Sequence, residues 1–448
     1  RVAFAFEGSE LSFTNAQLAW VQLNGELEWP RLVLRQIEAR AADATELTGS
    51  GAFDASARTL HDVQVNVSGP AGNAFLPEGY AFSNAMVSLR VNGELSGPEH
   101  AGEAVVEGVS TRFTKALDLT ASWKGKGWRI DEGQFVARAG TSELEGRLSA
   151  ILGGATNEVA VSGLTLAKGG NRLLALDQPF RVLWRRSDGA LRNGPEFSLG
   201  RIRWTGEQRS LDAEADIQWP GQGRFALEAV RLDRGVVDDF ITLPEGDFAV
   251  RRLAVEGGWT NGPVVFALTN ASELVAAGGY LFECTAAARG DANGIVLERF
   301  AVTSGQRGVA HAEGTLPLTI EPAGEWVRFH PEGALVFRAS TDRASALWGE
   351  LAGLTGVLLS NPALNIDVQG TWSAPKGIVE MEVGQVQWTR APQKLPAIER
   401  FHLHAELSRE AVRVSDLEVR AEGQLIQARA DVPMDESAWE ALVLQRRW

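Results

Sequence analysis

Cysteine and long apolar runs are nearly absent from this chain. Its 448 residues include one cysteine, Cys284, which excludes an intramolecular disulfide framework. Cys284 stands in strand-like sequence with no histidine or second cysteine nearby, which indicates a structural residue rather than a reactive thiol. No apolar stretch reaches the length of a membrane-spanning helix, and no signal peptide is visible.

Basic patches are missing as well. The formal net charge is −14, and the 43 cations are mostly arginines scattered at alternate strand positions. A nucleic-acid partner requires clustered Lys and Arg that neutralise phosphates, so we do not expect one.

The sequence also lacks the motifs of common enzymes. It has no Gly-rich phosphate loop and no Gly-x-Ser-x-Gly elbow. Of six histidines, only His402 and His404 form a close pair, and we expect them on the solvated face of a strand rather than in a metal site. Asp238 and Asp239 are expected to cap a short helix. The sequence therefore predicts no enzyme activity, metal or cofactor, although a carbohydrate-active enzyme remains an alternative if two carboxylates meet on neighbouring strands.

A short β phrase recurs along the chain. Near the end, Val412-Arg-Val414, Leu417-Glu-Val419 and Ile426-Gln-Ala428 alternate apolar with polar residues between turns. Such strands place one apolar face and one polar face on a sheet. Earlier copies begin at Leu32, Trp128, Phe197 and Ile295, at spacings too irregular for a propeller.

Tight turns separate these strands. Type I′ hairpins are predicted at the Asn-Gly pairs that begin at Asn24, Asn92, Asn193, Asn261 and Asn293, and at Asp188-Gly189. A proline-initiated turn is predicted in Gly93-Glu-Leu95-Ser-Gly-Pro98, which recurs as Gly370-Thr-Trp372-Ser-Ala-Pro375. Neighbouring strands should then pair antiparallel as a meander. Short amphipathic helices are predicted over 340–354 and, more weakly, over 236–245.

The sequence therefore predicts an all-β fold: an elongated, curled antiparallel sheet with an apolar groove and a few short helices. Because no linker divides the chain, residues 1–448 are predicted to form one continuous quasi-repetitive β array. The residues expected to line the groove are the apolar strand positions Leu117, Leu119, Trp123, Phe401, Leu403, Leu407, Val412, Val414, Leu417, Val419 and Ile426. The same residues would form an ordinary core if the sheet closed into a sandwich.

The Gly-Pro phrases and the alternating strands that follow them, clearest between about Phe225 and Val432, resemble the TamB and AsmA-like family. Members of this family include the inner-membrane subunit of the translocation and assembly module. The resemblance implies a β-taco, which is a half-pipe with an apolar groove. Since the chain begins at Arg1 already in strand alternation, we expect it to be the middle of such a protein, with its membrane anchor outside this sequence.

What the resemblance implies about function is phospholipid transport. The chain would be a non-enzymatic scaffold that spans the periplasm of a Gram-negative-type bacterium, anchored in the inner membrane in the full-length protein. Its partners would be phospholipid acyl chains and an outer-membrane β-barrel protein whose assembly it assists. The alternative is a surface or secreted β-rich binding module, such as an adhesin or an autotransporter passenger, with a closed core and functional loops.

Overall fold

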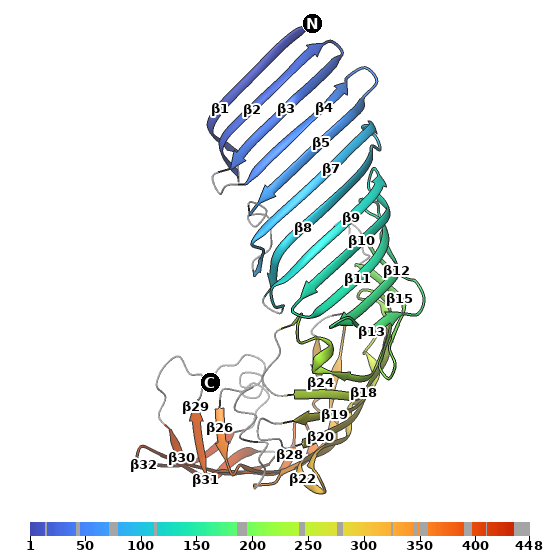
Figure 1. Cartoon of the computed structure of the whole chain (residues 1–448). Coiled ribbons are helices and arrows are strands. Elements are labelled where there is room, and N and C mark those ends of the chain that lie inside the picture. The colour runs from blue at the N-terminus through green and yellow to red at the C-terminus, as the bar shows by residue number, and fades with distance from the viewer. Residues whose placement is uncertain are drawn as a thin grey trace. The chain divides into compact units, whose positions relative to one another are not determined.

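Antiparallel strands dominate the computed structural model of this chain, and thirty of them belong to one long sheet (Figure 1). The all-β prediction is confirmed. The structure describes residues 1–13, 16–41, 45–70, 79–111, 114–185, 195–241, 247–275, 281–323, 326–343, 348, 357–388, 397–408 and 410–433. The chain divides into two compact units, which are described separately. The expectation of one uninterrupted array stays a prediction.

Unit 1 contains residues 1–190, 195–209 and 235–243. Its strands pair in chain order as a meander, with two exceptions. The short β6 pairs with β8, and β13 and β14 each pair with β12 on one side and with β15 on the other. The strands of this unit are β1 (Val2–Phe13), β2 (Ala16–Glu28), β3 (Arg31–Ala41), β4 (Glu46–Asp54), β5 (Thr59–Gly69), β6 (Tyr80–Ala81), β7 (Asn84–Glu94), β8 (Glu99–Thr111), β9 (Leu117–Lys126), β10 (Arg129–Ala139), β11 (Ser142–Ile151), β12 (Asn157–Lys168), β13 (Asn171–Leu176), β14 (Phe180–Arg185) and β15 (Glu196–Thr205).

Unit 2 contains residues 191–194, 210–234 and 244–448. From β16 to β32 its strands pair mainly in chain order, but β23 and β24 form a separate two-stranded sheet, β25 pairs with β27, and β26 pairs with β29. Its strands are β16 (Ser210–Gln218), β17 (Gln222–Asp233), β18 (Asp247–Thr260), β19 (Val265–Val275), β20 (Leu281–Asp291), β21 (Gly294–Ser304), β22 (Arg307–Leu316), β23 (Leu318–Ile320), β24 (Val327–Phe329), β25 (Ala334–Thr341), β26 (Val357–Ser360), β27 (Ala363–Thr371), β28 (Pro375–Val383), β29 (Gln385–Trp388), β30 (Ile398–Leu407), β31 (Ala411–Ala421) and β32 (Gln424–Pro433).

The turn predictions are confirmed in part. The proline turns join β7 to β8 and β27 to β28, and Asn261 and Asn293 lie in the turns after β18 and β20. Asn24 and Asn92 lie inside β2 and β7, so the two hairpins expected there are wrong. The pairs at 188–189 and 193–194 lie outside the described residues.

One short helical element has defined bounds in the described part of the chain. It is the 3-10 turn η2 (Arg234–Val236), which ends where the weaker of the two predicted helices was expected to begin. That prediction is therefore wrong over its described residues, 236–241, which continue mainly as turns. The helix predicted over 340–354 lies outside the described residues apart from 340–343, which include the end of β25, and Trp348.

Aromatic rings lie across glycines of the neighbouring strand. The glycine at position 25 pairs with Phe4, and a Cβ built there would lie 2.7 Å from the ring Cζ. The same arrangement recurs at the cross-strand pairs Trp123 with Gly102, Phe135 with Gly146, Phe225 with Gly257, Trp259 with Gly223 and Phe266 with Gly290. Large and small residues thus alternate across the sheet, so the rings lie flat on the apolar face. This packing explains why a glycine stands inside β2, where the sequence predicted a turn.

Replacing one of the glycines of this kind in unit 2 should destabilise that unit. In Gly290→Ala the new methyl group would overlap the ring of Phe266, and overpacking of this kind costs about 1–3 kcal/mol. Gly308→Ala is the matched control, because nothing lies within 4 Å of the added Cβ. Urea unfolding followed by tryptophan fluorescence compares the two. Equal midpoints for both variants would contradict the packing role of the glycine.

Candidate functional site: the apolar face of the sheet

One face of unit 1 carries rows of apolar residues across most of its strands. Cross-strand partners share a face, so the strand register traces a row from one strand to the next. One row contains only apolar residues and glycine over twelve strands: Phe6, Leu23, Ile37, Gly49, Val65, Leu89, Gly102, Trp123, Gly133, Leu148, Val161 and Phe180. At a strand spacing of about 4.8 Å, the row is about 50 Å long.

A second row beside the first has the same character. Its members lie two residues along or back on each strand, or three on β12, where the register shifts: Gly8, Val21, Ala39, Leu47, Val67, Val87, Ala104, Ala121, Phe135, Gly146 and Leu164. The opposite face carries a polar row: Glu7, Gln22, Glu38, Thr48, Asn66, Ser88, Glu103, Ser122, Gln134 and Arg147. The alternation of apolar and polar residues in the sequence therefore gives the sheet one apolar and one polar surface.

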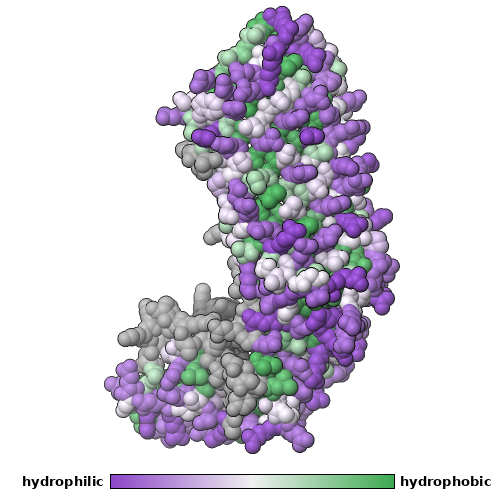
Figure 2. Space-filling model, viewed as in Figure 1, coloured by the Kyte–Doolittle hydropathy of each residue, from purple (hydrophilic) through white to green (hydrophobic). Residues whose placement is uncertain are grey.

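The apolar face of unit 1 is partly accessible to solvent. From β1 to β9, every residue of the first row is half-buried or exposed. Figure 2 shows hydrophobic residues (green) at the surface of this unit, among hydrophilic residues (purple). An ordinary core would bury such residues more completely.

Unit 2 has an equivalent row over thirteen strands. It consists of Ala213, Leu227, Val255, Leu268, Ala288, Leu297, Gly314, Phe337, Val368, Gly377, Leu407, Val412 and Val432. All of these residues except Val368 are half-buried or exposed. Each unit therefore carries its own continuous apolar face.

The structure places the eleven predicted groove residues on these faces. Leu117, Leu119 and Trp123 lie on the apolar face of β9. The other eight lie together on the apolar face of β30, β31 and β32: Phe401, Leu403, Leu407, Val412, Val414, Leu417, Val419 and Ile426. Ten are half-buried, and Ile426 is 57% exposed. Their role as lipid contacts stays a prediction.

A β-bulge is needed for this placement. Val414 and Leu417 are three residues apart and would face opposite sides of a regular strand. The register shifts between them, so that Val414 pairs with Ala405 while Leu417 pairs with Leu403. Similar shifts in other strands keep the apolar residues in phase, for example between Ile130 and Gly133.

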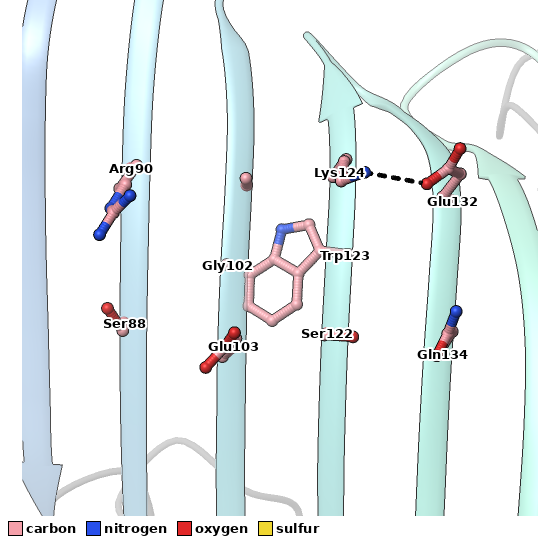
Figure 3. Close-up of a pocket in the computed structure, with 10 residues that line it drawn as sticks. Ser88, Arg90, Gly102, Glu103, Ser122, Trp123, Lys124, Glu132 and Gln134 are labelled. Carbon is pink, nitrogen blue, oxygen red and sulfur yellow. Dashed lines mark hydrogen bonds and ion pairs between the residues drawn. The ribbon is translucent and has the colours of Figure 1, made fainter.

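A shallow depression of about 400 Å³ lies on the polar side of β7–β10 (Figure 3). Figure 3 also shows the Trp123 ring extending toward Gly102 on the neighbouring strand. Two cations and two carboxylates line the depression, and one pair, Lys124 Nζ and Glu132 Oε2, is 3.2 Å apart and largely exposed. The charges balance in open solvent, so this surface offers little affinity for an ionic ligand.

The predicted face of the histidine pair is confirmed. His402 and His404 lie opposite the apolar row of β30, with acidic residues beside them. His404 Nδ1 is 3.2 Å from Glu380 Oε1, and His402 Nε2 is 3.7 Å from Asp416 Oδ2. Within the part of the chain that the structure describes, no three His, Cys, Asp or Glu residues are grouped so as to hold a metal ion.

Cys284 lies on β20 and packs against the main core cluster of unit 2, formed by Phe282, Val302 and Val309. Burial raises the pKa of its thiol, which keeps the thiolate scarce near neutral pH. The structural interpretation of this residue therefore fits its surroundings.

Asp238 and Asp239 do not cap a helix as predicted. They bind side chains at the end of the β11–β12 pair: Asp238 Oδ1 is 2.7 Å from Lys168 Nζ, and Asp239 Oδ2 accepts from Ser142 Oγ at 2.7 Å. Thr141 Oγ1 also donates to Asp239, at 3.2 Å. Sequence reasoning missed these contacts because the partners are 70 and 97 positions apart.

The electrostatics of this cluster favour the charged forms. The hydrogen bond from Ser142 and the charge of Lys168 lower the pKa of Asp239, and the hydrogen bond to Asp238 raises the pKa of Lys168. A lowered carboxyl pKa stabilises the fold above the unfolded pKa and loses that effect as pH falls through the folded one. A raised lysine pKa stabilises below the unfolded pKa and loses that effect as pH rises through the folded one. Both contributions are therefore present across the neutral range.

Comparison of the chain with protein-family models, curated proteins and solved structures finds no match. Among the described residues there is also no helix with the length and apolarity needed to cross a bilayer. A functional proposal therefore rests on the sheet itself and on the resemblance of its sequence phrases.

Proposed function

We propose that this chain is a non-enzymatic scaffold that carries phospholipid along its apolar faces between the inner and outer membranes. The observation that carries the proposal is the uninterrupted apolar row, twelve residues in unit 1 and thirteen in unit 2, whose members are mostly half-buried or exposed. A polar or charged side chain in such a row would impede the movement of an acyl chain, and neither row contains one.

The energetics of lipid transfer support this proposal. Each buried CH₂ group contributes about 0.8 kcal/mol, so a free acyl chain leaves a membrane slowly. A continuous apolar surface lowers that barrier without any catalytic residue. The aromatic rings that lie flat over glycines also keep this surface smooth, which favours the movement of an acyl chain along it.

The resemblance to the TamB and AsmA-like family supports the same setting. We place the chain in the periplasm of a Gram-negative-type bacterium, with an inner-membrane anchor elsewhere in the full-length protein. An outer-membrane β-barrel protein is the proposed partner at the far side.

Native mass spectrometry with lipid extraction tests this proposal. The chain is purified from bacteria without detergent, and we expect several phospholipids bound per chain. A compact, lipid-free chain would contradict the proposal and favour the binding module with a closed core.

A further inference from the structure

A short segment lies across the ends of several strands of unit 1, on the apolar side of the sheet. This strap, residues 235–241, is fixed by its backbone at both ends. The Gly235 carbonyl accepts from Lys168 Nζ at 3.0 Å, at the end of β12. The Phe240 carbonyl accepts from the Lys115 amide at 2.9 Å, and Ile241 forms a β-bridge with Thr114, just before β9. The strap thus runs along the ends of β9–β12.

Polar side chains hold the middle of the strap. Lys168 and Ser142 are cross-strand partners at the ends of apolar rows, where they replace the apolar residues of the same face. Lys168 Nζ lies 2.7 Å from Asp238 Oδ1 and 3.6 Å from Asp239 Oδ2. Ser142, which is 2% exposed, donates to Asp239. We call these four side chains the latch.

The apolar face of unit 1 is more deeply buried on β12 and β13 than on β8 and β9. A third row passes through Val106, Leu119, Ala137, Leu144, Leu166 and Leu174. Its members on β8 and β9 are half-buried, whereas Leu166 and Leu174 on β12 and β13 are 3% and 1% exposed. Val236 of the strap is itself 3% exposed.

We propose that the strap is a lid, held shut by the latch, that covers the apolar face at the ends of β9–β12 and limits how far along this face a lipid chain can lie. The identity of the ligand as a lipid rests on the function proposed above, whereas the opening of the strap does not depend on that function. The latch suits this role because a charged group released from its partners is readily solvated.

Thiol labelling measures the opening without lipid. Cys284→Ser removes the native thiol, and Val236→Cys then reports on the strap. We expect slow maleimide labelling with the latch intact and about tenfold faster labelling after Lys168→Met, because a hydrogen-bonded charge pair is lost. Lys126→Met, at an exposed position on the opposite edge of the sheet, is the control and should leave the rate unchanged. Fast labelling with the latch intact, or no change in Lys168→Met, would overturn the lid.

A second measurement tests regulation. In the Cys284→Ser background, Ser142→Cys and Asp239→Cys together remove the latch and place two thiols at its position. Oxidation joins these thiols in a disulfide that holds the strap shut, and reduction releases it. We expect fewer phospholipids per chain in the oxidised form than in the reduced form. Equal occupancy in both forms, with labelling that still depends on the latch, would refute regulation but leave the lid. Absence of lipid from the unaltered chain would instead refute the proposed function, while the labelling result would still decide the lid.

Discussion

Val65→Asp is expected to remove most of the phospholipid bound to unit 1. Val65 lies in the middle of the first apolar row, between Gly49 and Leu89. An acyl chain on that row would cover the carboxylate, and burial of an unpaired charge is far costlier than burial of a methyl group. We expect lipid per chain in this unit to fall about tenfold or more. Native mass spectrometry and binding of a fluorescent fatty acid measure the loss.

Gln64→Asp is the matched control. Gln64 precedes Val65, points to the polar face and lies between Ser50 and Arg90. The Gln64→Asp substitution adds the same charge to the same strand, but the new carboxylate lies in solvent beside Arg90. Lipid binding should therefore not change. If Val65→Asp stays folded and keeps its lipid, transport along this face is ruled out.

The same pair separates the open face from a closed sandwich core. In a closed core, Val65→Asp would bury a carboxylate and prevent folding. On an accessible face the aspartate reaches water, so the variant folds and loses only its ligand. Circular dichroism and the thermal unfolding midpoint of the variant therefore decide between phospholipid scaffold and closed binding module.

Within each regular run of a strand, alternation predicted which groove candidates share a face, because period-2 patterning is local. The eight candidates on β30–β32 even remain together across a bulge, since the apolar phase resets at Val414 and Leu417. Turn residues were less reliable. Asn24-Gly25 has hairpin composition, yet it lies inside β2 because the ring of Phe4 needs the space above its glycine.

Contacts between distant segments were beyond sequence reasoning. The carboxylates of Asp238 and Asp239 had a plausible local role at a helix end, and nothing nearby in sequence pointed to Lys168 or Ser142. The aromatic-glycine pairs had a usable signal, since glycine and a ring stand in the same phase of neighbouring strands. Reading that signal required the strand register, which hairpin length and bulges determine.

Phe282→Ala is expected to destabilise unit 2 more than any surface substitution. Phe282 is 2% exposed and forms the main core cluster with Val302 and Val309. Removal of a buried phenyl ring costs about 3–5 kcal/mol, because transfer and cavity terms add. For a unit of this size the thermal midpoint should fall by about 10 °C. Differential scanning calorimetry of the chain measures the shift.

Leu281→Ala provides the comparison, because Leu281 is the adjacent residue on β20, points to the other face and is 42% exposed. Its cost should stay below about 1 kcal/mol. A large difference between these neighbours would mean that β20 is sealed on the side of Phe282 and open to solvent on the side of Leu281. Similar costs at both positions would contradict this one-sided burial, because Leu281 would then be covered as well as Phe282.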